Sequence, residues 1–330
     1  FLVVAFAALL RFYGLSFGLP FNFHPDEVPK VNALERMRDA GNLDPNYFLH
    51  PSLLLYLSYF VNTFFQSSAG HALLRSLELD GSFRETAFLA GRTVSALAGT
   101  LSVYLVYRIG RRAFGPFVGF VAAGLLAVMP LHVTCSRYMK EDALLTCNAL
   151  VCLLLLVRAV QTGGLRSLFG AGLFAGVTFS TKYSGLVIAS PLFIVPWLRS
   201  WSWKPDPRFL KALPLVLLLV PIGFLLCTPY AYFNAERFLG DFQQEKHHME
   251  TGHSQVIDAW SQFWMYHLTY SIVPGVTTFP AFLALAGVGL LAWRRRREDL
   301  FVVLSLLMFY LPAELVKAKP HLRRLRHVRN

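Results

Sequence analysis

Residues 272–297 read IVPGVTTFPAFLALAGVGLLAWRRRR, an uncharged run of 22 residues followed by four consecutive arginines. An apolar run of roughly 18 residues or more can cross the hydrocarbon core of a bilayer as a helix. Basic residues next to such a run are typical of its cytoplasmic end. This stretch therefore predicts a membrane-spanning helix and points to an integral membrane protein.

The composition of the whole chain agrees with this prediction. The 330 residues are 55% hydrophobic and only 15% charged, with a mean hydropathy of +0.47, whereas soluble domains carry about 25% charged residues. The net charge of +12 comes from short basic tracts beside apolar runs, so we expect membrane topology and no nucleic-acid partner. The four cysteines form no CxxC motif and predict buried apolar positions, not disulfides or zinc ligands.

Further apolar segments divide the chain into a polytopic, all-α transmembrane bundle. They cover 1–20, 47–65, 86–107, 117–133, 143–157, 168–180, 184–198, 213–229, 272–293 and 300–316. If all ten crossed the membrane, the basic tracts would lie on both faces, against the positive-inside rule. Segment 47–65 contains several polar residues, so we interpret it as a juxtamembrane helix in the first external loop. About nine spans remain.

This topology places 21–85, 136–142 and 230–271 in external loops of a single transmembrane domain, 1–330. The chain starts inside an apolar run without Met and ends in a basic tail. We therefore expect a fragment of a longer protein, truncated at both ends. Small residues at four-residue spacing predict close helix contacts; these are Gly91, Ser95, Gly99, Gly172 and Gly176.

The first external loop carries two adjacent acids, Asp26 and Glu27, directly after the first predicted span. Acids beside a membrane are costly unless they are solvated or functional. A helix N-cap is the structural alternative, because acids are favoured at the start of a helix. Adjacent helical residues point in different directions, so the two are not expected to form a glycosidase-like acid–base pair.

Other polar side chains gather on the same face. His50 either binds a carboxylate or phosphate or caps an interfacial helix. In the turn 136–142, Arg137 and Lys140 break the positive-inside pattern and could meet an anion, or could simply pair with Glu141 or Asp142. Lys182 and Tyr183 stand at a similar membrane edge, where a lysine is a candidate functional residue.

A histidine-rich stretch suggests a metal site. His247, Glu250 and His253 are spaced by three residues and could share a helical face that binds a divalent metal ion. Gly252 weakens that helix and the spacing matches no strong zinc signature, so solvated loop histidines are the alternative. The sequence also has no P-loop or dinucleotide fingerprint. An enzyme working on the external face would need a lipid-linked donor.

The order of these motifs resembles the protein O-mannosyltransferase and aminoarabinose-transferase group. The matching residues are Asp26-Glu27, His50-Pro51-Ser52-Leu53, Ser136-Arg137 with Asp142, Thr181-Lys182-Tyr183-Ser184-Gly185 and Gly252-His253. These are GT-C glycosyltransferases that use polyprenyl-phosphate sugars. Ser52 stands where the mannosyltransferase motif commonly has a second proline.

The resemblance implies an inverting glycosyltransferase with Asp26 as catalytic base, acting at the external face of a bacterial plasma membrane. Its partners would be a polyprenyl-phosphate sugar donor and a protein, lipid or glycan acceptor. Arg137, Lys182 and Lys317 or Lys319 would face the donor phosphate. Glu27, His50, Asp142, His247 and His253 would position substrates or bind a metal, and Tyr183 is a further substrate-binding candidate.

Two other functions are consistent with the same sequence. A transporter or flippase of lipid-linked sugars would place charged residues along a path and should show polar or broken midspan helices. The apolar midspan stretches favour the enzyme. A non-catalytic membrane subunit would leave Asp26 replaceable.

Overall fold

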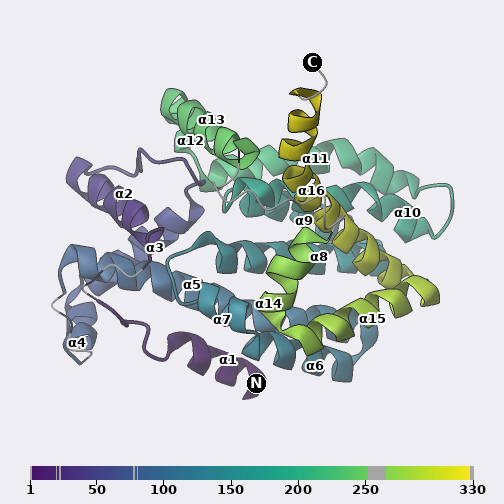
Figure 1. Cartoon of the computed structure of the whole chain (residues 1–330), viewed down its shortest axis with the longest axis horizontal. Helices are drawn as coiled ribbons and strands as arrows, with labels where there is room; N and C mark the ends of the chain where they lie inside the picture. Colours follow the sequence, from purple (N-terminus) through teal and green to yellow (C-terminus); the bar gives the residue numbers. More distant parts are fainter. Residues whose placement is uncertain are drawn as a thin grey trace.

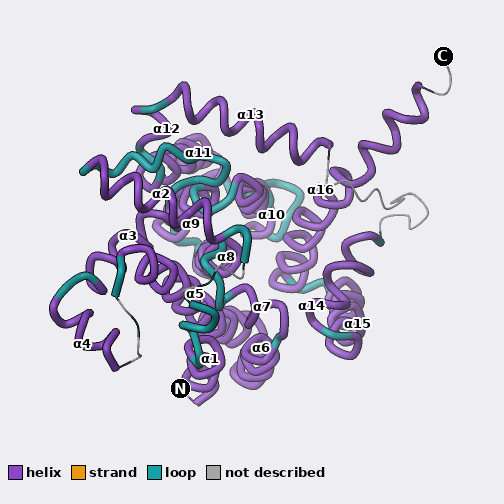
Figure 2. The backbone as a smooth tube through the Cα atoms, turned by 60° about the vertical axis from the view of Figure 1, so that its left-hand side comes forward, coloured by secondary structure: helices purple, strands orange, loops and turns teal. Residues whose placement is uncertain are grey.

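The computed structural model describes residues 2–19, 21, 24–76, 79, 81–251 and 265–327, with side chains outside 249–251 and 315–327. These residues form helices, turns and loops, and within those ranges the backbone contains no strand (Figures 1 and 2). The predicted all-α class is therefore confirmed.

The helices follow one another with short connections along most of the chain. In order they are α1 (Leu2–Phe12), α2 (Glu27–Ala40), α3 (Leu53–Phe65), α4 (Ser68–Ser76), α5 (Phe83–Phe114), α6 (Pro116–Val128), α7 (Pro130–Cys135), α8 (Glu141–Thr162), α9 (Leu165–Phe179), η1 (Tyr183–Phe193), α10 (Val195–Ser200), α11 (Pro207–Cys227), α12 (Tyr230–Phe233), α13 (Ala235–Thr251), η2 (Leu268–Ile272), α14 (Val273–Val276), α15 (Thr278–Arg294) and α16 (Arg297–His327).

Three described helices, α5, α8 and α11, are each long and apolar enough to cross a membrane. The pair Leu268–Val276 and Thr278–Arg294 passes the same test together but is bent by 113°. Four further apolar helices, α1, α3, α6 and α9, have 10–17 residues, shorter than the roughly 20 residues that cross a hydrocarbon core of about 30 Å. The juxtamembrane placement of α3 stays a prediction. The count of nine spans stays a prediction.

Prolines divide two of the predicted spans. Segment 117–133 breaks at Met129, and Pro130 then starts α7, because proline lacks the N–H that would continue α6. Segment 184–198 becomes the 3₁₀ helix η1, which contains Pro191, followed by α10.

A buried arginine stabilises the break after α6. The Arg11 side chain is fully buried and donates to the carbonyls of Leu126 and Ala127 at 3.3 and 3.2 Å. It also lies 2.9 Å from Nδ1 of His132 in α7. Carbonyls in the last turn of a helix lack the usual intrahelical donor; that of Leu126 accepts a backbone hydrogen bond from the Met129 N–H, at 3.4 Å. Arg11 from α1 therefore supplies donors that the interrupted helix lacks.

The predicted small-residue contacts are found between α9 and α11. A Cβ atom on Gly172 would lie 2.4 Å from the Val216 carbonyl oxygen, and one on Gly176 only 2.0 Å from that of Val220. The two helices therefore approach so closely that only glycine fits.

Helix α5 organises the part of the fold that matters for function. It packs against α1, α2, α3, α6 and α8. Two ion pairs join α2 to α5 in opposite chain order, Glu27 with Arg92 and Glu35 with Arg84, so α2 lies antiparallel along α5. Helices α2, α12 and α13 lie toward one end of the long axis and α10 toward the other (Figure 1).

Candidate functional site

Asp26 stands immediately before α2 but does not cap it. Its side chain makes no hydrogen bond to the first turn of the helix, is 48% exposed and lies 3.2 Å from Nζ of Lys140. Partial burial would raise the pKa of Asp26. The hydrogen bond and charge of Lys140, with the charges of Lys30 and His24, outweigh burial and hold that pKa below its usual value. Asp26 is therefore ionised, accessible and not used by the helix.

The Asp26–Lys140 contact continues into a chain of alternating charges. Nζ of Lys140 lies 3.8 Å from Oδ2 of Asp142, and Oδ1 of Asp142 lies 3.0 Å from Nζ of Lys182. All four side chains are between 30% and 48% exposed. Burial opposes the charge of Lys182, but Asp142 raises the pKa of its ammonium. The α2 start, the α8 start and the turn before η1 thus meet in one chain of charges, in which Lys140 contacts Asp26 and Lys182 is joined to Lys140 through Asp142.

A buried ion pair supports this chain of charges. Lys30 and Glu141 are 2% and 3% exposed, and the Nζ–Oε1 distance is 3.2 Å. Nζ of Lys30 also donates to the backbone carbonyl of Asp26 at 2.9 Å. This pair fixes the start of α2 against the start of α8, and so fixes Asp26 relative to Asp142.

The side chain of Glu27 points away from that of Asp26, as expected of adjacent residues at the start of a helix. Its carboxylate is fully buried and receives Nε and Nη2 of Arg92, both at 2.9 Å. The backbone N–H of Met139 donates to Oε1 at 2.8 Å. Protein donors occupy both oxygens, so the geometry favours a positioning role over the substrate contact expected from the sequence.

Arg92 is a residue that the sequence interpretation missed. It is fully buried within the apolar stretch of α5 and also donates to the carbonyls of Leu15 and Phe17 at 3.1 and 2.8 Å. The available signal was a single arginine inside an apolar run, since such a charge needs a buried partner.

The loop that carries His50 is tied to two distant elements. Phe48 donates its N–H to Asp241 of α13 at 2.7 Å and accepts at its carbonyl from the Tyr183 hydroxyl at 2.6 Å. Asp44 accepts from Asn234 at 2.8 Å. Tyr183 is therefore placed as a buried support of this loop, while Nδ1 of His50 is buried without a hydrogen-bond partner in the described part of the chain.

Arg137 faces away from the charge chain. Its Nη2 donates to the carbonyls of Tyr13 and Gly14 at 2.8 and 3.4 Å, and its guanidinium stands 5.3 Å from the Phe17 ring centre. The structure brings Lys140, not Arg137, to Asp26.

The proposed metal ligands and tail lysines fall largely outside the described residues. His247 lies exposed on α13, whereas His253 and the side chains of Glu250, Lys317 and Lys319 are outside the described part. Among described residues, no three histidine, cysteine or acidic side chains are close enough to hold a metal. The metal prediction stays untested.

Comparisons with known proteins give the sequence and fold relationships of this chain. Residues 82–233 match the family model described as Dolichyl-phosphate-mannose-protein mannosyltransferase. Two Bacillus subtilis (strain 168) proteins, "Putative mannosyltransferase YycA" and "Putative mannosyltransferase YkcB", are each 34% identical over 103 residues. That stretch is 31% of this chain but only 15% and 14% of those proteins.

Solved structures share the fold across 72–97% of this chain. ArnT from Cupriavidus metallidurans, solved with undecaprenyl phosphate, is 21% identical with a TM-score of 0.63, covering 97% of this chain and 58% of ArnT. The Saccharomyces cerevisiae Pmt1–Pmt2 complex bound to the sugar donor is 22% identical with a TM-score of 0.52. This match covers 72% of this chain and 33% of the chain in that structure. An Archaeoglobus fulgidus oligosaccharyltransferase is 13% identical with a TM-score of 0.59, and the match covers 96% of this chain and 49% of that protein. These matches confirm the predicted GT-C-like fold.

Proposed function

We propose that this multi-pass membrane chain of GT-C-like fold is the membrane domain of a polyprenyl-phosphate-dependent glycosyltransferase, moving a sugar to an acceptor hydroxyl with inversion. The observation that carries the proposal is the Asp26 carboxylate, which is accessible, ionised and held by Lys140 without capping its own helix. The family match over residues 82–233 supports the reaction class.

Asp26 would act as the general base. The acceptor oxygen attacks the anomeric carbon while the bond from that carbon to the donor phosphate oxygen breaks. The proton of the acceptor hydroxyl passes to Asp26, and the bonding electrons leave with the phosphate. A polyprenyl phosphate leaves as a stable anion, so this step needs no second carboxylic acid.

The leaving phosphate instead needs positive charge, which fixed cations supply best when they are already in place. Lys140 lies 3.2 Å from Asp26 and 3.8 Å from Asp142, and Lys182 joins the same chain of charges through Asp142 at 3.0 Å. We assign Lys140 and Lys182 the phosphate contact that the sequence gave to Arg137, Lys182 and Lys317 or Lys319. Glu27 and Tyr183 would position this site, with His50 at its edge.

The basic tracts 108–112, 199–211 and 294–297 would lie in the cytoplasm, which puts Asp26 on the external face of the plasma membrane. The donor would therefore reach the site from within the membrane, as a lipid-linked sugar. The acceptor would be a hydroxyl of a protein, lipid or glycan in the cell envelope.

The test is sugar transfer by the full-length protein from a polyprenyl-phosphate donor, comparing Asp26→Asn with Asp39→Asn. Both variants lose one carboxylate charge from the first loop. Asp39 makes an exposed pair with Arg38 at the far end of α2, a kind of contact that contributes little to stability. Loss of a general base typically costs 10²–10⁴-fold in turnover. Undiminished transfer by Asp26→Asn would refute the assignment and favour a non-catalytic subunit.

A further inference from the structure

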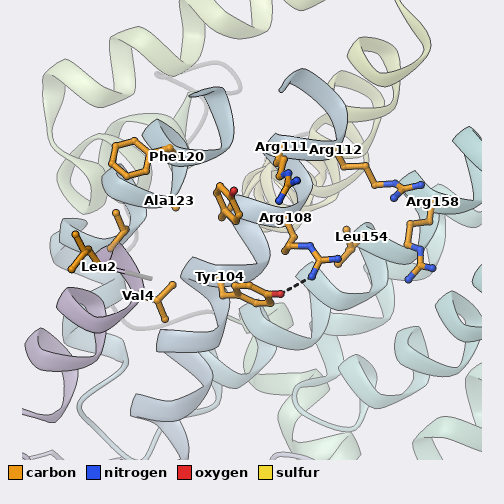
Figure 3. Close-up of a pocket in the computed structure, with 12 residues that line it drawn as sticks. Leu2, Val4, Tyr104, Arg108, Arg111, Arg112, Phe120, Ala123, Leu154 and Arg158 are labelled. Carbon is orange, nitrogen blue, oxygen red and sulfur yellow. Dashed lines mark hydrogen bonds between the residues drawn. The ribbon is translucent and has the colours of Figure 1, made fainter. Parts of the chain in front are cut away.

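A large cavity lies away from Asp26. It has a volume of about 810 Å³ and lies between α1, α5, α6 and α8. Four arginines line it, Arg108, Arg111 and Arg112 from α5 and Arg158 from α8. Figure 3 shows the arginines gathered on one side, and Leu2, Val4, Phe120 and Ala123 on the other.

These arginines are available to a ligand. Arg108 donates to the hydroxyl of Tyr104, and within the described ranges none of the four guanidinium groups forms an ion pair with a carboxylate. Arg294, from a neighbouring basic tract, is by contrast neutralised by Asp299. Four like charges around one cavity repel one another, and a bound anion would relieve that repulsion.

The cavity and the Asp26 site lie at opposite ends of the same two helices. On α5, Arg108 follows the buried Arg92 by 16 residues; on α8, Arg158 follows Asp142 by 16 residues. Sixteen helical residues span about 24 Å, most of the roughly 30 Å thickness of a bilayer core. The arginine cavity therefore opens near the other membrane surface.

We propose that this cavity binds an acidic phospholipid, with the phosphate headgroup among the four arginines and an acyl chain along the apolar wall. Its volume is in the range of sites that enclose small molecules. Leu2 and Phe120 are 88% and 56% exposed and so offer an apolar rim toward the membrane. Basic pockets between membrane helices on the cytoplasmic side suit anionic lipid headgroups, whereas a soluble phosphate would gain nothing from the apolar wall.

The experiment measures lipid binding to the full-length protein in a neutral detergent by thermal shift and by native mass spectrometry. The probes are phosphatidylglycerol, phosphatidylcholine and inorganic phosphate. One variant changes Arg108, Arg111, Arg112 and Arg158 to Gln. The matched control changes Arg166, Lys204, Lys211 and Arg295 to Gln, removing four exposed charges outside the cavity. The double variant Arg111→Gln/Arg158→Gln serves if the quadruple variant fails to fold.

We expect the protein and the control variant to retain phosphatidylglycerol in preference to phosphatidylcholine. Each cation near a lipid surface is worth about a fivefold change in binding, so the cavity variant should lose on the order of 600-fold and the double variant about 25-fold. Equal losses in the cavity and control variants would show general surface attraction and overturn the proposal. Equal stabilisation by inorganic phosphate would overturn the lipid as the ligand. Either failure would leave the proposed transferase reaction untouched.

Discussion

The buried Glu27–Arg92 pair allows a direct test of how the site is held, through the substitution Glu27→Gln. Both side chains are fully buried, with two hydrogen bonds of 2.9 Å between them. Gln preserves the volume, so no cavity is created, but the guanidinium loses its counter-charge. Removing one partner of a buried ion pair costs about 3–5 kcal/mol. We expect the lower end, because Gln keeps an acceptor for the Met139 N–H.

The chain offers a matched control on the same two helices. Glu35 of α2 pairs with Arg84 of α5 at 2.6 Å, but the two side chains are 26% and 40% exposed. An exposed pair contributes only about 0–1 kcal/mol. Glu35→Gln should therefore cost less than a third of what Glu27→Gln costs, although each variant replaces a Glu that pairs with an Arg of α5 by Gln.

The assay is unfolding of the full-length protein in detergent, followed by circular dichroism. A double variant, Glu27→Gln with Arg92→Gln, tests the coupling: because the two residues act as one unit, the combined loss should be well below the sum of the single losses. Equal losses from Glu27→Gln and Glu35→Gln, or additive losses in the double variant, would refute the reasoning.

Three further predictions concern the charge chain and the helix contacts. Lys140→Gln removes the hydrogen bond and the charge that most lower the pKa of Asp26. Since activity requires ionised Asp26, the acid limb of the kcat/KM profile should move to higher pH, whereas Lys204→Gln should leave it in place. An unmoved acid limb in Lys140→Gln would argue against Asp26 as the base. Lys182→Met should lower kcat by about 10²-fold if this ammonium stabilises the leaving phosphate. Lys204→Met, which changes an exposed lysine, should leave kcat unchanged. Equal kcat values for the two variants would show that Lys182 is not part of the site. Gly176→Val should cost about 1–3 kcal/mol of stability by overpacking, because its Cβ would lie 2.0 Å from the Val220 carbonyl oxygen. Gly287→Val should cost clearly less, because a Cβ at that position has no atom within 4 Å. Equal losses of stability in unfolding measurements would contradict the α9–α11 packing.

Several features of the protein were decided locally and could be predicted. Long uncharged runs such as 213–229, most of which lies on α11, indicate membrane helices because hydrocarbon excludes unpaired backbone and charge. The run 272–293 instead divides after Val276 into two helical parts bent by 113°, which its hydropathy did not predict. Glycine spacing at Gly172 and Gly176 predicted a close helix contact, since only the absence of a side chain permits it. Asp26 and Lys182 are candidates because charges beside apolar runs need a reason to be there, whereas Asp142 is a candidate because of the family resemblance.

The tertiary structure determines which charged side chains form ion pairs with one another. The sequence offered Arg137 and Lys140 as equal cations in one short turn, but only Lys140 reaches Asp26, because Arg137 turns toward the chain after α1. Glu27 looked as available as Asp26, yet α2 lies along α5 and places Glu27 against Arg92, 65 positions away. Side-chain type and hydropathy are properties of the sequence, whereas ion pairing depends on helix packing, which brings distant residues within 3 Å and leaves Asp26 facing outward.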